Sequence, residues 1–512
     1  MTTTKSENGG WSNGQLLGLT LFLLAAICLF HLISAAADRP IYRDQHLGAA
    51  VEYSKTGIDL LKPVIPGFNA TQTPTPQELP LWQAMTALAF KFLGPWHGWA
   101  NVVSLIAFFS CLFPLFRLAE FYAGIRCAWW TMVFFLTQPL IFLYAGEAST
   151  DGFSLASAVW FLFFAVKLLQ TGKLIWWLPA CLAGGIAAVS KLPFFMAAGL
   201  TCFFLTVIFH RNTFRPWILL GSAGVVIVGL FFAWTAYTNR CIAMAEFPLV
   251  DLRVSNPESA FWYFGDWHYR LSPGNWIKGG WRILNACFGS FALVGLCLYP
   301  LLFLKGNLFA RLSLLAACLT TLVFTHLVLH HGHYYLMFSP AIAILCAQAA
   351  ADLEKKVALK QRWQSNLGLI AVAVVLSLSI LQGLIGMKTV LSYDPYPHDI
   401  AKIIQKYCGE SDKLLIEGGG WGGQELLLTD RRGLSIWDTK FLEDKRNYDR
   451  LKSLGYNKLV MISESPLLTA LQQINPGESK LARLTYQTHL TPVARDWPTL
   501  YQDENILIKE LP

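Results

Sequence analysis

The feature that most constrains this chain is a series of apolar runs, each long enough to cross a lipid bilayer as one helix. A spanning helix needs roughly 20 mainly apolar residues. Eleven segments approximate that length, at about 16–36, 99–118, 127–145, 153–170, 174–191, 193–210, 216–236, 282–304, 311–329, 335–351 and 367–387. Only 14% of the residues are charged, whereas soluble domains carry about 25%. The sequence therefore predicts a polytopic α-helical membrane protein with about 11 transmembrane helices. It excludes a soluble enzyme, a disordered tail protein and a disulfide-stapled secreted module.

The basic residues predict the orientation of these helices. The segments predicted to lie on the same side of the membrane as the N-terminus contain thirteen Lys and Arg residues and four acidic residues. Cytoplasmic loops carry such an excess, so the N-terminus is predicted to be cytoplasmic and the C-terminus periplasmic. The expected location is a bacterial inner (plasma) membrane, crossed many times. The run Ala35-Ala36-Ala37 would also suit a signal cleavage site, but the preceding apolar run is long for a signal peptide, which favours an anchor.

Two domains are expected. Residues 1–387 form the transmembrane domain, whose outer loop 37–98 contains helical spacing at Arg43–Lys55 and an apolar stretch, Pro80–Gly94, suited to a helix at the membrane interface. Residues 388–512 carry more charge and short β-type runs. These are Leu414–Glu417, Leu434–Trp437, Leu459–Ile462 and Ile506–Lys509, with helix-like stretches at Asp399–Tyr407 and Asp444–Leu454 between them. This alternation predicts a small α/β domain with a partly parallel sheet on the outer side.

Ionisable residues at the outer face are the candidate functional residues, because ionisable groups at membrane depth are energetically costly and are by default functional candidates. The first outer loop offers Arg43, Asp44 and, further on, Glu78. Asp151 precedes the fourth span, where it could also be a plain helix cap. Lys191 ends the fifth span, where it could also extend its amine toward the interface.

A histidine cluster lies between the ninth and tenth spans. It comprises His330, His331 and His333, followed by Tyr334 and Tyr335. Three imidazoles could bind a metal, but no Cys or carboxylate with zinc-site spacing lies near them in the sequence. Polar contacts to substrate are the favoured interpretation, and a divalent metal remains a possible cofactor whose ligands the sequence does not identify.

The order and sidedness of these motifs resemble those of a known superfamily. The motifs are Tyr42-Arg43-Asp44-Gln45, Glu78-Leu79-Pro80-Leu81-Trp82, Phe90-Lys91-Phe92-Leu93-Gly94, Ala148-Ser149-Thr150-Asp151-Gly152, Ser190-Lys191-Leu192-Pro193 and His333-Tyr334-Tyr335. Together they resemble the GT-C membrane glycosyltransferases, in the protein O-mannosyltransferase and aminoarabinose transferase branch. The resemblance spans residues 16–390 and, more loosely, the α/β tail.

The resemblance implies transfer of a sugar from a polyprenyl-phosphate donor to a glycolipid (such as lipopolysaccharide) or protein acceptor at the outer face of the inner membrane. It assigns Asp44 as the catalytic base and Asp151 as the second acid. The branch often has Asp-Glu at the first position, whereas Gln45 follows Asp44 here. Glu78 is therefore a further candidate for the second carboxylate.

The chemistry fits this assignment. An acceptor hydroxyl must lose its proton as it attacks the anomeric carbon, and a carboxylate can act as the general base. A cation such as Lys191 or Arg43 would stabilise the departing phosphate, and direct displacement would invert the anomeric centre. The partners are then the lipid-linked donor, the acceptor and the bilayer. Nucleic acid is excluded, because the basic residues lie mostly in short loops. Two rivals are a polysaccharide ligase or polymerase on the same carrier, and a transporter or flippase, for which paired broken helices would be expected.

Overall fold

The computed structural model divides the chain into two compact units. The first contains Met1–Ile41, Asn101–Thr235 and Val254–Val390, and the second contains Tyr42–Ala100, Ala236–Arg253 and Leu391–Pro512. The structure describes residues 11–36, 44–249, 251, 253–303, 307–358, 370, 372–382, 384–385, 395–418, 423–437, 439–464, 486–488 and 490–512. Most of the glycine-rich run 418–423 lies outside these residues.

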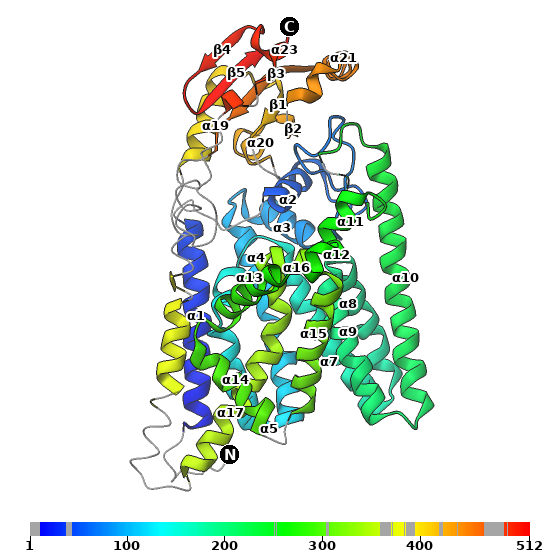
Figure 1. The fold of residues 1–512 in the computed structure, drawn as a ribbon, viewed down its shortest axis with the longest axis vertical. Helices are drawn as coiled ribbons and strands as arrows, with labels where there is room; N and C mark the ends of the chain where they lie inside the picture. The colour runs from blue at the N-terminus through cyan, green and yellow to red at the C-terminus, as the bar shows by residue number, and fades with distance from the viewer. Residues whose placement is uncertain are drawn as a thin grey trace. The chain divides into compact units, whose positions relative to one another are not determined.

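Long apolar helices make up the first unit (Figure 1). Its helices are α1 (Asn13–Ala36), α5 (Leu112–Leu136), α6 (Pro139–Tyr144), α7 (Thr150–Thr171), η1 (Leu174–Trp176), α8 (Trp177–Ser190), α9 (Leu192–Phe209), α11 (Pro257–Phe264), α12 (Trp267–Leu271), α13 (Pro273–Ile283), η2 (Leu284–Phe288), α14 (Phe291–Phe303), α15 (Leu308–Val323), α16 (Thr325–His330), η3 (Gly332–Phe338) and α17 (Ser339–Ala358). Two further helices, α4 (Gly98–Phe109) and α10 (Phe214–Met244), continue from one unit into the other.

Six helices in the described part of the chain are long and apolar enough to cross a membrane, or up to seven if one bent pair is a single span. Three shorter apolar helices, Leu174–Ser190, Leu308–Val323 and Val372–Gln382, fall where the sequence predicts spans. The protein is thus a multi-pass membrane protein, as expected, and the number eleven stays a prediction. The predicted spans are shortened by breaks: Gly124 has φ 85° within α5, and a bend of 93° separates Pro273–Phe288 from Phe291–Phe303.

The bend between η2 and α14 requires a glycine. Gly289 has φ +67°, a left-handed conformation that residues with a Cβ rarely adopt. A Cβ at this position would also meet Pro139 Cγ at 2.9 Å. The positive φ and the close contact with Pro139 both explain why this bend requires a glycine.

The core of the first unit is aromatic and aliphatic. Phe108, Trp130 and Phe135 are fully buried, and the rings of Phe108 and Phe135 stack with centroids 5.7 Å apart. Such close packing fixes the positions of the neighbouring helices. It therefore also fixes the short segments between helices, where the polar residues of the candidate site lie.

The second unit contains a five-stranded mixed sheet in the order β2-β1-β3-β5-β4. The strands are β1 (Lys413–Glu417), β2 (Arg432–Ile436), β3 (Tyr456–Ile462), β4 (Thr499–Gln502) and β5 (Ile506–Glu510). β1 runs parallel to both of its neighbours, and β5 is antiparallel to β3 and β4. The predicted partly parallel sheet is confirmed, with four strands where they were expected. β4 was not predicted.

Both faces of this sheet are covered, as the apolar β1 sequence requires. Leu414 and Ile416 pack with α19 (Tyr396–Tyr407) and α20 (Gln424–Thr429), whereas Leu415 faces the cluster that contains Leu451 of α21 (Lys445–Ser453). Successive strand residues point to opposite faces, so one short strand supplies both cores. Short helices η4 (Thr439–Glu443), η5 (Tyr486–Thr488) and α23 (Pro492–Arg495) complete this part of the unit.

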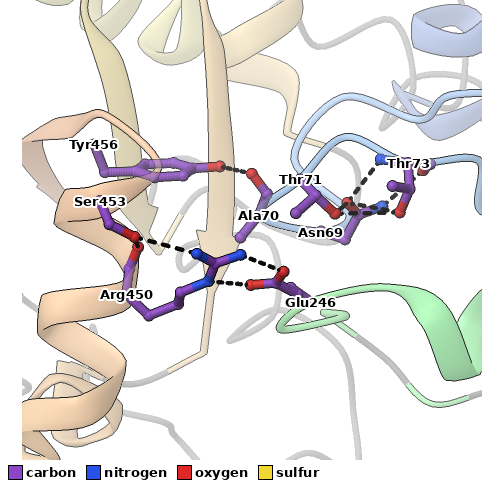
Figure 2. A network of polar contacts seen from close by, with 8 residues as sticks. All are labelled: Asn69, Ala70, Thr71, Thr73, Glu246, Arg450, Ser453 and Tyr456. Atoms are coloured by element: carbon purple, nitrogen blue, oxygen red, sulfur yellow. Dashed lines mark hydrogen bonds and ion pairs between the residues drawn. The ribbon is translucent and has the colours of Figure 1, made fainter.

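The first outer loop is attached to this sheet (Figure 2). The Tyr456 hydroxyl donates to the Ala70 carbonyl over 2.9 Å, and the Ala70 amide donates to the Glu246 carbonyl over 2.8 Å. Arg450 donates through two nitrogens to the Glu246 carboxylate, at 2.6 and 2.7 Å. Gly67, with φ +79°, forms a parallel bridge to Leu434 at the β2 edge. The loop is thus built into the same unit as the α/β domain.

Two helices of the first outer loop were expected, and both are present. α2 (Asp44–Thr56) covers the stretch with helical spacing, and α3 (Leu81–Leu93) covers the apolar stretch. Gly94 caps the C-terminus of α3, with φ 97°, and its amide donates to the Phe90 carbonyl. Trp82 on α3 is fully buried, while Phe92 is largely exposed.

Candidate active site

Asp151 is a buried carboxylate in the first turn of α7. The helix cap is Ser149, whose hydroxyl oxygen accepts from the Asp151 amide, so Asp151 is not itself the cap. The Asp151 side chain is 0% exposed. Its position in the first turn favours a negative charge, because backbone N–H groups at a helix N-terminus carry partial positive charge.

Ser149 connects Asp151 to a second carboxylate. Its Oγ lies 3.2 Å from Asp151 Oδ2 and 2.9 Å from Glu147 Oε2. A hydroxyl has one hydrogen to donate, so Ser149 can donate to only one of them at a time. Glu147 directly precedes the motif Ala148–Gly152, and the sequence analysis gave it no role.

Lys191 occupies the break between α8 and α9. Its backbone is extended, with φ −151° and ψ 96°, and it ends one helix and begins the next. Pro193 fits the first turn of α9, where a backbone N–H would have no helical partner. Lys191 Nζ lies 3.2 Å from Asp151 Oδ1, and the lysine side chain is 6% exposed. The break thus directs an amine inward to a carboxylate rather than outward to the membrane interface.

His333 and Tyr334 bring a third segment to this pair. His333 Nε2 lies 3.8 Å from Asp151 Oδ1, and Lys191 Nζ lies 5.4 Å from the centre of the Tyr334 ring. The rings of His333 and Tyr334 are 4.3 Å apart, and Tyr144 lies against His333 at 6.3 Å. The sequence could not associate His333 with a carboxylate, because Asp151 is far away along the chain.

The other residues of the histidine cluster form a layer around Trp262. Its ring lies 5.5 Å from His330 and 4.9 Å from His331. His326, which sequence reasoning missed, stacks on His330 at 5.3 Å. Burial lowers the pKa of His330, and the nearby His326 and Arg282 add to this effect. Tyr335 is 1% exposed and donates its hydroxyl to a backbone carbonyl.

An apolar groove begins next to the Asp151–Lys191 pair. Phe194 follows Pro193 in the first turn of α9. Its ring stacks on Tyr334, with the ring centres 6.0 Å apart, and it lines the groove. Its other lining residues come from α5, α7, α9, α15, η3 and α17 and are nearly all apolar, and they include Leu155, one turn after Asp151. The groove is narrow, with a cavity volume of ≈ 40 Å³. Two lining residues, Leu155 and Phe194, thus follow the charged pair closely along the chain.

Two further site candidates belong to the second unit. Asp44 is the first residue of α2, and Glu78 Oε2 lies 3.5 Å from His46 Nε2. Arg43 and the side chain of Asp44 lie outside the described residues. Asp44 and Glu78 thus belong to the second unit, and the cluster described above belongs to the first.

The cluster has donors for an anion but no evident metal site. Among the residues that the structure describes, no group of three or more His, Cys, Asp or Glu side chains could hold a metal ion. Lys191, His333 and Tyr144 can donate hydrogen bonds, and the lysine amine forms an ion pair with Asp151. Such a set suits a phosphate.

The sequence matches no known family profile. No curated protein matches it either. Solved structures, by contrast, match along most of the chain.

The crystal structure of ArnT from Cupriavidus metallidurans bound to undecaprenyl phosphate superposes with a TM-score of 0.62 at 13% identity, covering 97% of this chain and 98% of that one. The archaeal oligosaccharyltransferase AglB from Archaeoglobus fulgidus, in complex with an inhibitory peptide and a dolichol-phosphate, gives 0.53 at 9% identity and covers 87% and 69%. The arabinofuranosyltransferase AftD from Mycobacteria gives 0.52 at 13% identity and covers 98% and 40%.

All three of these proteins are GT-C membrane glycosyltransferases. At such low identities, the likeness establishes the fold. The GT-C fold and the small α/β domain expected from the sequence are confirmed.

Proposed function

We propose that this chain, which has the GT-C fold, is a glycosyltransferase that moves a sugar from a polyprenyl-phosphate carrier to a glycolipid or protein acceptor. The observation that carries the proposal is the position of Lys191. Its amine is buried against Asp151 and lies over the Tyr334 ring. The same ring stacks on Phe194, which lines the apolar groove. A phosphate on an isoprenoid tail needs a cation near an apolar surface, and the Lys191 amine and the groove that Phe194 lines support this assignment.

The proposed reaction is a direct displacement. The acceptor oxygen forms a bond to the anomeric carbon, and the bond from that carbon to the carrier phosphate breaks. The acceptor proton passes to the Asp44 carboxylate, which acts as general base. The carrier phosphate leaves with an additional negative charge, which the Lys191 amine stabilises. The sugar is transferred with inversion.

Asp151 is assigned a supporting role in this scheme. Its carboxylate, held by the α7 N-terminus and by Ser149, fixes the Lys191 amine at one position. His333 lies on the same carboxylate oxygen at 3.8 Å and supplies a further donor. His330, His331, Tyr335 and Arg43 are proposed to contact substrate, and Glu78 is an alternative second carboxylate.

The undecaprenyl phosphate and the dolichol-phosphate seen in ArnT and AglB support a lipid-linked donor here.

We propose an outward-facing site in a bacterial inner membrane, with a cytoplasmic N-terminus and a periplasmic C-terminus. A reporter that is active only in the periplasm, fused after Met387, should be active. Activity of a cytoplasm-only reporter at the same point would reverse the orientation.

Lys191 provides the test of the proposed function. After reconstitution of the purified protein in lipid vesicles, Lys191→Ala should weaken the binding of undecaprenyl phosphate. It should also slow sugar transfer by at least about 100-fold, because the loss of one transition-state contact reduces the rate on that order. Lys191→Arg should keep part of both activities. The matched control is Lys356→Ala, which breaks the exposed pair between Lys356 Nζ and Asp352 at 2.9 Å and should change neither. Unchanged carrier binding and transfer in Lys191→Ala would reject the assignment.

A further inference from the structure

A small cavity in the second unit is lined by an unusual number of polar side chains. It lies among α2, the segment that leads to Glu78, and the start of α3. Its volume is ≈ 10 Å³, about the space that one water molecule occupies by this measure. The candidate must therefore be a ligand with a single heavy atom.

Four polar atoms of the side chains lining this cavity are buried without a hydrogen-bonding partner among the described residues. They are His46 Nδ1, Thr75 Oγ1, Gln77 Nε2 and Gln83 Oε1. His46, Thr75 and Gln83 are at most 5% exposed. Buried polar groups nearly always have partners, so four such atoms around one cavity indicate a bound group that satisfies them together.

The hydrogen-bonding character of these atoms identifies the group. His46 Nε2 faces Glu78 Oε2 at 3.5 Å. In the neutral ring with its hydrogen on Nε2, toward that carboxylate, Nδ1 is an acceptor. Gln83 Oε1 is a second acceptor. The Gln77 amide nitrogen and the Thr75 hydroxyl are donors.

We propose that this cavity is a binding site for one water molecule. Water donates two hydrogen bonds and accepts two, which matches two acceptors and two donors. A metal cation would match the acceptors but would be repelled by the Gln77 N–H group. The water joins α2, the segment before Glu78 and α3, and it holds the His46 ring with Nε2 directed at Glu78. This inference is independent of the reaction proposed above.

The first test reads the ring of His46 in the full-length protein. Nitrogen NMR of histidine-labelled protein, with His46 assigned from a His46→Gln variant, should show the neutral form with its hydrogen on Nε2. A hydrogen on Nδ1 would overturn the proposal. So would a shift of the His46 signals on adding Zn²⁺, Mn²⁺ or Mg²⁺ after chelation, because that would identify the ligand as a cation.

The second test asks whether two residues share one water. Thr75→Val and Gln83→Met each remove one partner at nearly constant shape, and each should lower the thermal midpoint. The thermal midpoint of the double variant should fall by clearly less than the sum of the two single decreases, because the second substitution acts on a water site that the first has already weakened. The control combines Thr75→Val with Thr86→Val, a fully buried threonine of α3 that does not line the cavity, and should be additive. Additive losses for Thr75→Val and Gln83→Met would contradict a shared water.

Discussion

The two units of this protein each contain an ion pair that holds segments together, but the pairs differ in exposure. Lys191 and Asp151 in the first unit have side chains that are 6% and 0% exposed, whereas Arg450 and Glu246 in the second unit are 48% and 36% exposed. Burying two charges costs several kcal/mol per ion, and their attraction offsets this only in part. An exposed pair avoids that cost and contributes correspondingly little. The buried pair is therefore poor evidence for stability, and the role in sugar transfer proposed above gives another reason for its presence.

The sharpest test of this comparison separates stability from activity at the buried pair. Asp151→Asn alone should destabilise the protein by about 3–5 kcal/mol, because it leaves the Lys191 charge buried without its carboxylate. The double variant Asp151→Asn with Lys191→Met should regain most of that loss, since it leaves no uncompensated charge. Sugar transfer should stay lost in both variants. Thermal unfolding and transfer assays on the same preparations make the measurement, and recovery of transfer in the double variant would refute the functional reading.

A smaller effect is expected where the first outer loop meets the sheet. Tyr456→Phe removes the hydroxyl that donates to the Ala70 carbonyl and should cost about 1 kcal/mol of stability. Tyr407→Phe is the control, because the Tyr407 ring packs against Tyr501 at 4.6 Å and phenylalanine preserves that contact. Equal midpoints for the two variants would mean that the Tyr456 bond does not hold the loop.

The smallest effect is expected at the exposed pair. Arg450→Ala should lower stability less than Tyr456→Phe does. Hydrogen bonds from Arg450 lower the pKa of Glu246 from its usual 4.5, so the contribution of the pair is present above about pH 4.5 and is lost as the pH falls below the lowered value. Arg446→Ala, which breaks a local pair with Asp444 on α21, is the control. A loss at Arg450→Ala as large as at Asp151→Asn would remove the distinction between the pairs.

The sequence predicted much of the fold because helices that cross membranes and strands that are buried have strong local patterns. α2, α3 and four strands lie where these patterns placed them. β4 was missed because Thr499–Gln502 is short and only partly buried. The joining of Gly67 to the β2 edge depends on contacts between segments far apart along the chain, which local patterns do not reveal.

The candidate site was predicted as separate motifs. Asp151, Lys191, His333 and Tyr334 were singled out by charge and sidedness, and the structure brings these four together. Their mutual pairing and the complete burial of Asp151 depend on the packing of α7, α8 and η3, so the sequence could not show them. The water site around His46 was missed for the same reason, since its partners Thr75 and Gln83 are unremarkable alone.

The central claim is that the buried Lys191–Asp151 pair serves sugar transfer from a lipid carrier. Mass spectrometry of envelope glycolipids and glycoproteins tests it most directly. It compares four strains: a deletion strain without this protein, and the same strain expressing the wild type, Lys191→Ala or Lys356→Ala. We expect one sugar-bearing product to be present with the wild type and Lys356→Ala, and absent with Lys191→Ala and with no protein. Identical envelope sugars in all four strains would contradict the claim.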